Sequence, residues 1–314
     1  GIQRTEEGTY VDGSGKPLSE EFQSRIQTLG LPPAWKDIKL SPDPNSPLQA
    51  TGKDIKGKEQ YAYTATHDAK SAAEKFERLK QFVKVLPELT EKLREDLDSE
   101  DPVAKEAAGV LLLMRKTGFR IGSEVDTKTE HKALGATTLT NANVIIKGRK
   151  VSFSFIGKKG VQIDQTIEDK ELAGIVVSHV KNSGKLFDIS DKQVRDYLHN
   201  RAGGFKPKDM RTLVAAETAL QAISEIKAPK TEKEYKKARK QVAEIVSQKL
   251  GHTPTVALAS YIPPEIFGPW QANLTEETSP KKIPQKPRKA SKSLGTCFVS
   301  WKRLTTQHQK VLTL

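Results

Sequence analysis

The chain of 314 residues contains a single cysteine, Cys297, so no disulfide bond can form within it and a reducing compartment is indicated. Long apolar runs are also missing, because the longest, residues 107–114, is far too short to cross a bilayer. The first residues show no apolar signal core. We therefore expect a soluble cytoplasmic protein without a membrane partner.

The patterns that bind common cofactors are absent as well. No glycine-rich loop of the ATP-binding or dinucleotide-binding kind occurs, and no Gly-x-Ser-x-Gly segment is present. The six histidines are scattered, and no cluster of histidine, cysteine and carboxylate residues has metal-ligand spacing. Any chemistry is therefore expected to proceed without a metal, a nucleotide or another cofactor.

Acidic residues are absent after Glu277, whereas nine lysines and arginines follow it. The formal net charge is +13, which leaves only +4 for the residues up to Glu277. Strong basicity indicates a polyanionic partner, either nucleic acid or an anionic membrane. Residues 271–314 are rich in proline, lysine and serine, and we expect them to form a disordered basic tail.

The rest of the chain changes character near residue 70. Residues 1–70 contain short alternating runs and many turn formers, which predict a small β-rich N-terminal domain. Tyr61 and Tyr63 alternate on one face of an expected strand, with Lys53 and Lys58 close by. The expected strand therefore presents a basic and aromatic face, although packing within the β-rich domain is an equally ordinary role for the tyrosines.

Residues 71–270 have mainly helical periodicity and predict a mainly helical domain, the one that carries the candidate catalytic residues described below. Two helical segments precede a third that begins at Asp101-Pro102, and further helices are expected at residues 169–181, 190–201, 207–225 and 231–250. Three alternating runs, at residues 144–146, 151–155 and 161–163, predict a small antiparallel sheet. The expected fold is therefore α+β, with a β-rich domain followed by a mainly helical domain that carries a three-stranded sheet.

Three basic residues occupy unusual positions in this helical domain. Arg120 lies between Gly118 and Gly122, which would let a ligand approach closely, although it is also placed to complement a helix dipole. Lys158 lies in a turn between two strands, where a solvated lysine is ordinary. Arg211 opposes the dipole at a helix N-terminus, so it needs a partner, and Asp209 is a candidate.

His252 and Tyr261 complete a set that is more informative than its members. Two arginines can clamp the oxygens of a phosphodiester and balance the charge that develops during reaction. A tyrosine has an ordinary pKa of about 10, so cations are needed to favour its nucleophilic phenolate. The departing sugar oxygen needs a general acid, which a lysine on a hairpin can supply. Together these residues predict a phosphodiester site that uses no metal.

These segments resemble, in order and spacing, the type IB DNA topoisomerases, and most closely their small bacterial and poxvirus-like branch. The matching segments are Gly118-Phe-Arg120-Ile-Gly, Phe155-Ile-Gly-Lys158-Lys-Gly, Lys208-Asp-Met-Arg211-Thr, Leu250-Gly-His252-Thr-Pro and Ser260-Tyr261. The segments Pro32-Pro-Ala-Trp-Lys-Asp, Gln49-Ala-Thr-Gly-Lys-Asp and Gln60-Tyr-Ala-Tyr resemble the β-rich clamp domain of that branch. The resemblance covers roughly residues 8–268.

The resemblance implies that Tyr261 attacks a phosphodiester of double-stranded DNA and forms a 3′-phosphotyrosyl link. Arg120, Arg211 and His252 would bind the phosphate, and Lys158 would protonate the leaving 5′-oxygen. The cut strand would swivel and then be resealed without ATP or metal. A monomer that closes around DNA of the nucleoid is implied, with Tyr61, Tyr63, Lys53 and Lys58 contacting the duplex.

The chain departs from this pattern after Arg120. Poxviral members carry base-contacting basic and aromatic residues there, whereas this chain has Ser123-Glu-Val-Asp126, so a site-specific cleavage preference is not implied.

Two alternative functions, a tyrosine recombinase and a non-catalytic DNA-binding protein, predict different residues at these positions. A tyrosine recombinase usually has histidine three residues before its second arginine, where this chain has Lys208. A non-catalytic DNA-binding protein would lack the nucleophile.

Overall fold

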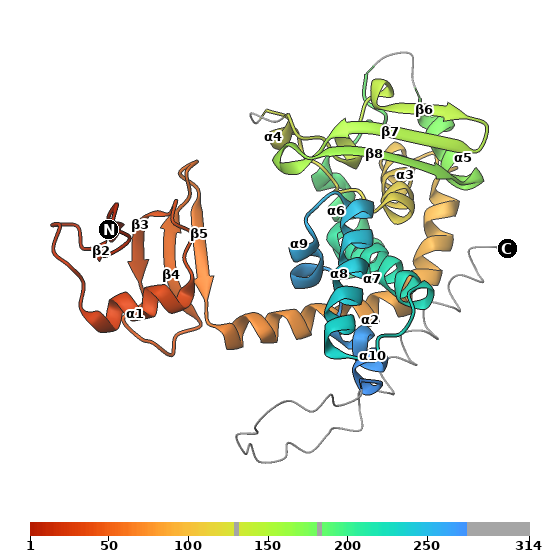
Figure 1. Cartoon of the computed structure of the whole chain (residues 1–314). Coiled ribbons are helices and arrows are strands. Elements are labelled where there is room, and N and C mark those ends of the chain that lie inside the picture. The colour runs from red at the N-terminus through yellow and green to blue at the C-terminus, as the bar shows by residue number, and fades with distance from the viewer. Residues whose placement is uncertain (129–131, 181–183, 275–314) are drawn as a thin grey trace. The chain divides into compact units, whose positions relative to one another are not determined.

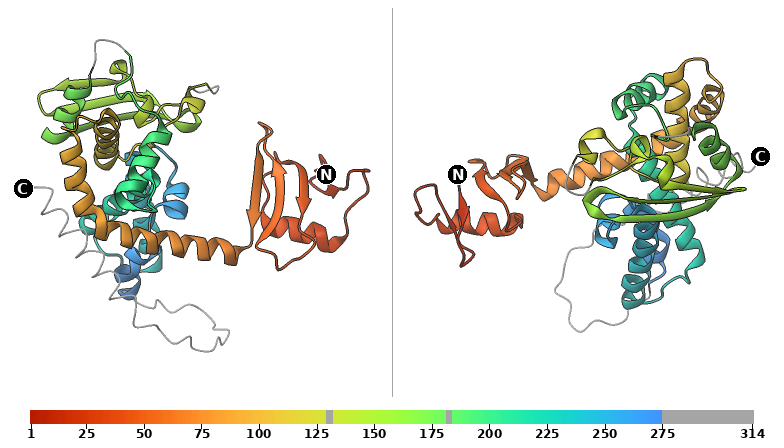
Figure 2. Two further views of the ribbon diagram at one scale, coloured as in Figure 1. Left: turned by 180° about the vertical axis from the view of Figure 1, so that it is seen from behind. Right: turned by 90° about the horizontal axis from the view of Figure 1, so that it is seen from above.

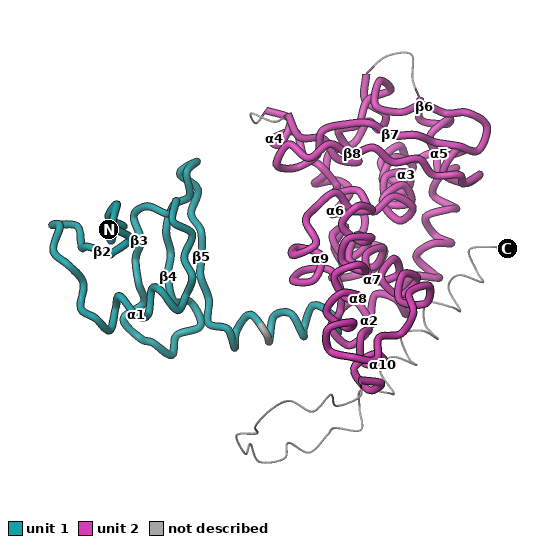
Figure 3. Tube along the Cα trace, viewed as in Figure 1, with its two compact units in different colours: residues 1–77 teal, residues 78–314 magenta. Residues whose placement is uncertain are grey.

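The computed structural model of the chain describes residues 1–128, 132–180 and 184–274. Two compact units divide the chain, Gly1–Glu77 and Arg78–Leu314 (Figure 3). The division falls inside helix α2 (Ala65–Asp96), so the first turns of α2 belong to unit 1 and its remainder to unit 2. The basic tail expected at residues 271–314 lies, from residue 275 onward, outside the described residues.

Unit 1 combines five short strands with helix α1 and the first turns of α2 (Figure 1). One antiparallel sheet has three strands in the order β3-β4-β5, and β1 pairs with β2. Ile26, Ile38 and Ala50 are buried in the core of this unit. The elements are β1 (Gln3–Arg4), β2 (Tyr10–Val11), α1 (Glu20–Leu29), β3 (Lys36–Leu40), β4 (Leu48–Lys53) and β5 (Glu59–Tyr63).

Helix α1 was not predicted from the sequence, although its signals are present. The side chain of Ser19 accepts a hydrogen bond from the backbone N–H of Phe22 and caps the first turn. Gly30 ends the helix in the left-handed conformation. Phe22 and Ile26 lie one turn apart, and only Ile26 is fully buried. The apolar face is therefore narrow, and the turn formers around it obscured the helical period.

Unit 2 is mainly helical and carries one sheet (Figures 1 and 2). Its antiparallel strands have the order β6-β7-β8, which confirms the predicted three-stranded sheet. The α+β fold class is thereby confirmed. The elements after α2 are α3 (Pro102–Thr117), α4 (Glu124–Thr127), β6 (Val144–Lys147), β7 (Lys150–Ile156), β8 (Gln162–Glu168), α5 (Lys170–His179), α6 (Asp191–Ala202), α7 (Pro207–Glu225), α8 (Glu232–Leu250), α9 (Pro254–Ser260) and α10 (Gly268–Ala272). Short 3₁₀ turns cover Ala136–Thr138, Asn141–Asn143, Lys158–Gly160 and Pro264–Phe267.

Helix α2 differs from the prediction of two separate helices before Asp101. It runs without interruption through Pro87, which has no backbone N–H to donate to the preceding turn. Phe82, Leu86, Leu89 and Leu93 are all buried on one side of the helix. Burial of this continuous apolar face offsets the lost hydrogen bond, so packing overrides the local preference of proline.

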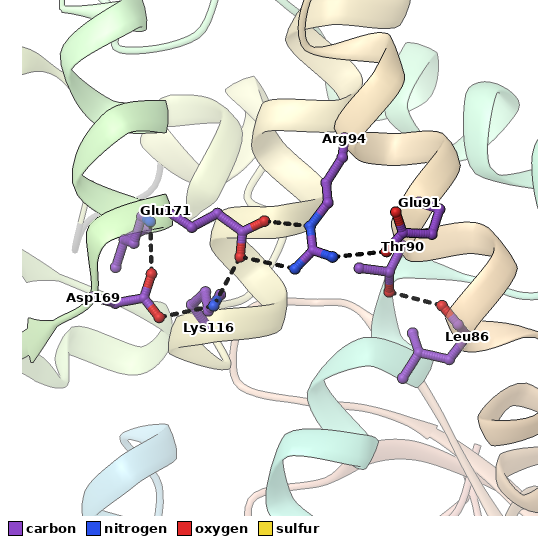
Figure 4. A network of polar contacts seen from close by, with 8 residues as sticks. Leu86, Thr90, Glu91, Arg94, Lys116, Asp169 and Glu171 are labelled. Carbon is purple, nitrogen blue, oxygen red and sulfur yellow. Dashed lines mark hydrogen bonds and ion pairs between the residues drawn. The ribbon is translucent and has the colours of Figure 1, made fainter. Parts of the chain in front are cut away.

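A network of charged side chains joins helices α2, α3 and α5 (Figure 4). Arg94 of α2 donates to Glu171 of α5 at 2.6 Å. Lys116 of α3 lies 2.8 Å from Asp169 and 2.9 Å from Glu171. Burial acts to raise the pKa of Glu171, but Arg94 and Lys116 together hold that pKa below its ordinary value. The network therefore fixes the outer helices around α3, whose residues are buried along most of its length.

Within the described ranges, no helix has both the length and the apolar composition needed to cross a membrane. The same ranges contain no group of three or more histidine, cysteine, aspartate or glutamate side chains arranged to hold a metal ion.

Candidate active site

Two helices of unit 2 end next to each other, and the predicted site is built on their C-termini. Helix α3 is followed by Gly118 with a φ of 74°, and helix α8 is followed by Gly251 with a φ of 62°. Both glycines are left-handed caps, a conformation that disfavours side chains. A Cβ at Gly118 would lie 2.5 Å from Leu250 Cδ2, so the two helix ends are in direct contact. Arg120 and His252 follow immediately, one after each helix end.

Arg211 bridges these two helix ends. It is only 3% exposed, and it donates to the carbonyl of Gly118 and to the carbonyl of Leu250, both at 2.5 Å. Carbonyls at a helix C-terminus have no partner within the helix and carry partial negative charge, so they suit a buried cation. Burial, followed by repulsion from Arg120, lowers the pKa of Arg211 to about 10, which leaves it protonated at neutral pH.

Asp209 is not the partner of Arg211, which corrects the expectation drawn from the sequence. The Asp209 carboxylate instead accepts hydrogen bonds from Arg78 at 3.1 and 3.0 Å and from the backbone N–H of Lys206 at 2.8 Å. Asp209 therefore caps the start of α7 and holds α2 against it, while Arg211 extends to the helix ends.

Arg120 is held in place by packing against the sheet and against a neighbouring loop. The adjacent Phe119 ring makes edge contacts with Phe153 and Phe155 of β7, at centroid distances of 5.1 and 4.9 Å. A Cβ at Gly122 would lie 2.9 Å from Gly135 Cα, so this glycine allows two backbone segments to meet. The glycines around Arg120 are thus explained by close protein packing, and the predicted close approach of a ligand is not needed to account for them.

Tyr261 directly follows helix α9 and is 5% exposed. Its hydroxyl accepts N–H groups from Arg211 Nε at 3.4 Å and from Arg120 Nη1 at 3.5 Å. Burial alone would raise the pKa of Tyr261, but the guanidinium groups of Arg211 and Arg120 outweigh it and lower that pKa below its ordinary value. The two cations therefore favour the phenolate, which is the form that acts as a nucleophile.

His252 stacks on Tyr261, with ring centroids 4.9 Å apart and planes inclined by 10°. Its Nδ1 lies 3.1 Å from the carbonyl of Thr253, a contact that places the proton on Nδ1. Burial, and then the charges of Arg211 and Arg120, lower the pKa of His252 to about 4. The ring is therefore neutral at physiological pH. Its Nε2 atom is buried and has no hydrogen-bond partner in the part of the chain that the structure describes.

Lys158 lies at the turn between β7 and β8, in the predicted position. Its side chain is exposed, and it has no hydrogen-bond or ion-pair partner among the described residues. Together with Arg120, Arg211 and Tyr261 it lines a cavity of about 330 Å³. Four of the five predicted catalytic residues thus border one cavity, and the fifth, His252, stacks on the tyrosine.

Two further basic residues, Arg195 of α6 and Lys208 of α7, line the same cavity and were not predicted. Lys208 precedes Arg211 by three residues on one helix, a spacing that places both on one face and could have revealed it. Arg195 forms a 2.6 Å ion pair with Asp191, four residues earlier on the same helix. In the sequence, this spacing is the same as that of an ordinary ion pair on a helix surface, so it does not mark Arg195 as a site residue.

The four residues predicted to bind DNA lie in unit 1. Tyr61 and Tyr63 are 51% and 38% exposed on one face of β5, and the Tyr63 ring stacks on His67 at 4.5 Å. Tyr61 donates to Glu59 at 3.1 Å, and Lys53 forms a 3.0 Å ion pair with Asp37. Lys58 is exposed. Two of the four therefore have acidic neighbours, and their role toward DNA stays a prediction.

Unit 2 is thus a mainly helical unit with a three-stranded sheet, in which two arginines surround a buried tyrosine hydroxyl. The chain belongs to the type IB DNA topoisomerase family. Residues 56–265 match the family described as eukaryotic DNA topoisomerase I, catalytic core, and residues 9–54 match the bacterial DNA topoisomerase IB N-terminal domain. The predicted family and enzyme class are confirmed, and the recombinase alternative is disfavoured.

Two relatives that are named as DNA topoisomerases agree with this assignment. The chain is 28% identical to DNA topoisomerase 1B of Acanthamoeba polyphaga mimivirus over 287 residues, which is 83% of this chain and 85% of the relative. It is 26% identical to DNA topoisomerase 1 of Rabbit fibroma virus (strain Kasza), over 69% of this chain and 70% of the relative. A solved post-cleavage complex of the XerH site-specific recombinase with palindromic difH substrate has 13% identity and a TM-score of 0.38; the match covers 58% of this chain and 50% of the recombinase chain.

Proposed function

We propose that this chain relaxes supercoiled double-stranded DNA by transient cleavage of one strand through a 3′-phosphotyrosyl intermediate at Tyr261. The observation that carries the proposal is the Tyr261 hydroxyl, which accepts hydrogen bonds from both Arg120 and Arg211. A buried tyrosine between two cations is activated as a nucleophile and has anion-binding groups beside it. No metal, ATP or other cofactor takes part in the proposed reaction.

The scissile phosphate would occupy the cavity next to Tyr261. Arg211 has five N–H donors, of which two bind the helix carbonyls and one binds Tyr261, so part of its fork stays available. Arg120 is not tied to helix carbonyls in this way and supplies the second guanidinium group. The two charges would balance the negative charge that grows on the non-bridging oxygens as the tyrosine attacks.

His252 would join the phosphate through its unpartnered Nε2 atom. In the neutral ring with the proton on Nδ1, Nε2 carries a lone pair and cannot donate to a phosphate oxygen. A bound phosphate anion offsets the charges of Arg120 and Arg211, which raises the pKa of His252. The ring would then take up a proton and donate from Nε2, so phosphate binding is coupled to protonation.

Cleavage forms the bond between the Tyr261 oxygen and phosphorus and breaks the bond from phosphorus to the 5′-oxygen. The phenol proton passes to solvent, and Lys158 gives a proton to the departing 5′-oxygen. The free 5′-end swivels around the intact strand. The 5′-hydroxyl then attacks the phosphotyrosine, returns its proton to Lys158 and releases Tyr261.

Unit 1 would contact the duplex through Tyr61, Tyr63, Lys53 and Lys58 and would act as a clamp. The enzyme is expected to act as a monomer on DNA of the nucleoid in the cytoplasm. A tyrosine ring can contact either bases or sugars, whereas lysines contact phosphates without reading sequence.

A relaxation assay on a supercoiled plasmid, in EDTA and without ATP, tests this function. The wild-type protein should relax the plasmid, and the Tyr261→Phe variant should bind the plasmid with unchanged affinity without relaxing it. A wild-type protein that binds the plasmid but never relaxes it would show that the chain is a non-catalytic DNA-binding protein. Loss of DNA binding in Tyr261→Phe would indicate a structural tyrosine.

A further inference from the structure

The hairpin that carries Lys158 is attached to the same two helix ends that Arg211 bridges. Gln165 of β8 donates from Nε2 to the carbonyl of Thr117 and to the carbonyl of Lys249, both at 3.3 Å. These carbonyls directly precede the Gly118 and Leu250 carbonyls that Arg211 occupies. One amide from the sheet and one guanidinium from α7 thus bridge α3 and α8 at adjacent positions, where backbone acceptors lack helical partners.

A second contact from the same strand face supports this attachment. Ile163 precedes Gln165 by two residues, so both side chains point to the same face of β8. A Cβ at Gly251 would lie 2.0 Å from Ile163 Cδ1, and a Cβ at Gly157 would lie 3.2 Å from Ile163 Cγ1. Ile163 therefore packs between the cap of α8 and the residue that directly precedes Lys158.

The side-chain amide of Gln165 donates hydrogen bonds but accepts none from the described part of the chain. Its Oε1 atom is buried and has no hydrogen-bond partner in the described part of the chain, whereas Nε2 makes two bonds. A buried acceptor without a partner is unfavourable, and an apolar side chain of similar shape would avoid that loss. The two bonds from Nε2 are therefore the feature that glutamine contributes at this position.

We propose that Gln165 is a positioning residue for Lys158. By fastening β8 to the ends of α3 and α8, it holds the β7–β8 turn so that the lysine ammonium reaches the cavity beside Tyr261. This inference rests on the proposed role of Lys158 as the general acid. Gln165 itself touches neither DNA nor the reacting atoms.

The Gln165→Met variant removes both donors and keeps the length of the side chain. Misplacement of a reacting group by 1 Å slows a reaction by about 10²-fold, so single-turnover cleavage of an ordinary DNA duplex should slow by roughly this factor. The loss should lie in protonation of the leaving group. In a duplex with sulfur in place of the 5′-bridging oxygen, the leaving group is a thiolate. Because the conjugate thiol has a pKa of about 8.5, this leaving group departs without a proton donor. On this duplex the variant should cleave at the wild-type rate.

Gln162→Met is the matched control. Gln162 lies on the same strand and is exposed, and its side-chain amide donates to Ser154 and Asp164 within the sheet. This variant should cleave both duplexes as the wild type does. The thermal unfolding midpoint and the DNA affinity of each variant should be measured alongside, so that a general loss of structure is recognised.

Lys158→Ala separates the inference from the proposed function. Rescue of Lys158→Ala by the sulfur duplex supports Lys158 as the general acid, and absence of that rescue overturns its proposed role. If Lys158→Ala is rescued while Gln165→Met stays slow on both duplexes, Gln165 acts on the phosphate site and the inference is wrong. Equal cleavage by Gln165→Met and wild type on the oxygen duplex would also overturn it.

Discussion

Replacing Gly251 by alanine should lower the free energy of unfolding through backbone strain and through a steric clash. The structure allows these two contributions to be measured separately. The residue caps α8 with a φ of 62°, and an added Cβ would lie 2.0 Å from Ile163 Cδ1. The left-handed conformation costs an alanine about 1–2 kcal/mol. Forcing apart a packed contact costs about 1–3 kcal/mol more. The free energy of unfolding should therefore fall by roughly 2–5 kcal/mol.

Gly148→Ala supplies the comparison for the backbone contribution alone. Gly148 has a φ of 61° in the turn between β6 and β7, and an added Cβ would meet nothing within 4 Å. The Gly148→Ala variant should lose only the free energy that the left-handed backbone conformation costs an alanine, about 1–2 kcal/mol. Denaturant unfolding of both variants measures the difference, and plasmid relaxation should fall far more in Gly251→Ala, because Ile163 is displaced together with the Lys158 hairpin.

Ile163→Val provides a direct test of the proposed clash, since it removes the Cδ1 atom. Alone it should cost about 0.5–1.5 kcal/mol. Combined with Gly251→Ala it should recover part of the loss, with a favourable coupling of about 1–3 kcal/mol in a double-mutant cycle. If Gly251→Ala costs no more than Gly148→Ala, or if the two changes are simply additive, the proposed contact between hairpin and helix end is wrong.

Three further predictions concern charges in unit 2. Arg120→Met removes one of two cations near Tyr261, so the pKa of Tyr261 should rise; ultraviolet titration against Tyr261→Phe measures it, and an unchanged pKa would contradict the described geometry. Glu217→Gln leaves the buried Arg115 without its carboxylate partner at 2.7 Å and should cost about 3–5 kcal/mol by urea unfolding, whereas exchanging both for apolar residues should cost less. The pKa of Glu171 is lowered on folding, so its contribution to stability is present above the unfolded pKa of about 4.3 and is lost as the pH falls through the lower folded value. The difference in unfolding free energy between wild type and Glu171→Gln should therefore shrink in acid, and a constant difference would refute the ion pair.

Much of unit 2 could be predicted because its local signals agree with its packing. Helix α7 (Pro207–Glu225) has proline in its first turn and matches the predicted range, and the strands at β6 to β8 alternate as expected. The sequence also singles out the candidate residues Arg120, Lys158 and Arg211, because each one lies at a helix end or at a turn. Their convergence, however, depends on the contact between α3 and α8, which no local pattern encodes.

The remaining features depend on contacts between distant segments. Asp209 is close to Arg211 in sequence, yet Arg78, 131 residues away, is its actual partner. The helix carbonyls that hold Arg211, and those that hold Gln165, are backbone groups and leave no trace in residue identity. Helix α2 passes through Pro87 because a long apolar face is buried, a tertiary effect that outweighs the local preference.

The most direct test is to trap the covalent intermediate on a DNA duplex in which the strand segment downstream of the cleavage site is very short. After cleavage, this short segment dissociates and cannot be religated. The released fragment should carry a free 5′-hydroxyl. The protein should be linked through Tyr261 to the 3′-phosphate of the upstream strand, as peptide mapping by mass spectrometry would show. An adduct that persists in Tyr261→Phe, or one formed on a 5′-phosphate, would contradict the account.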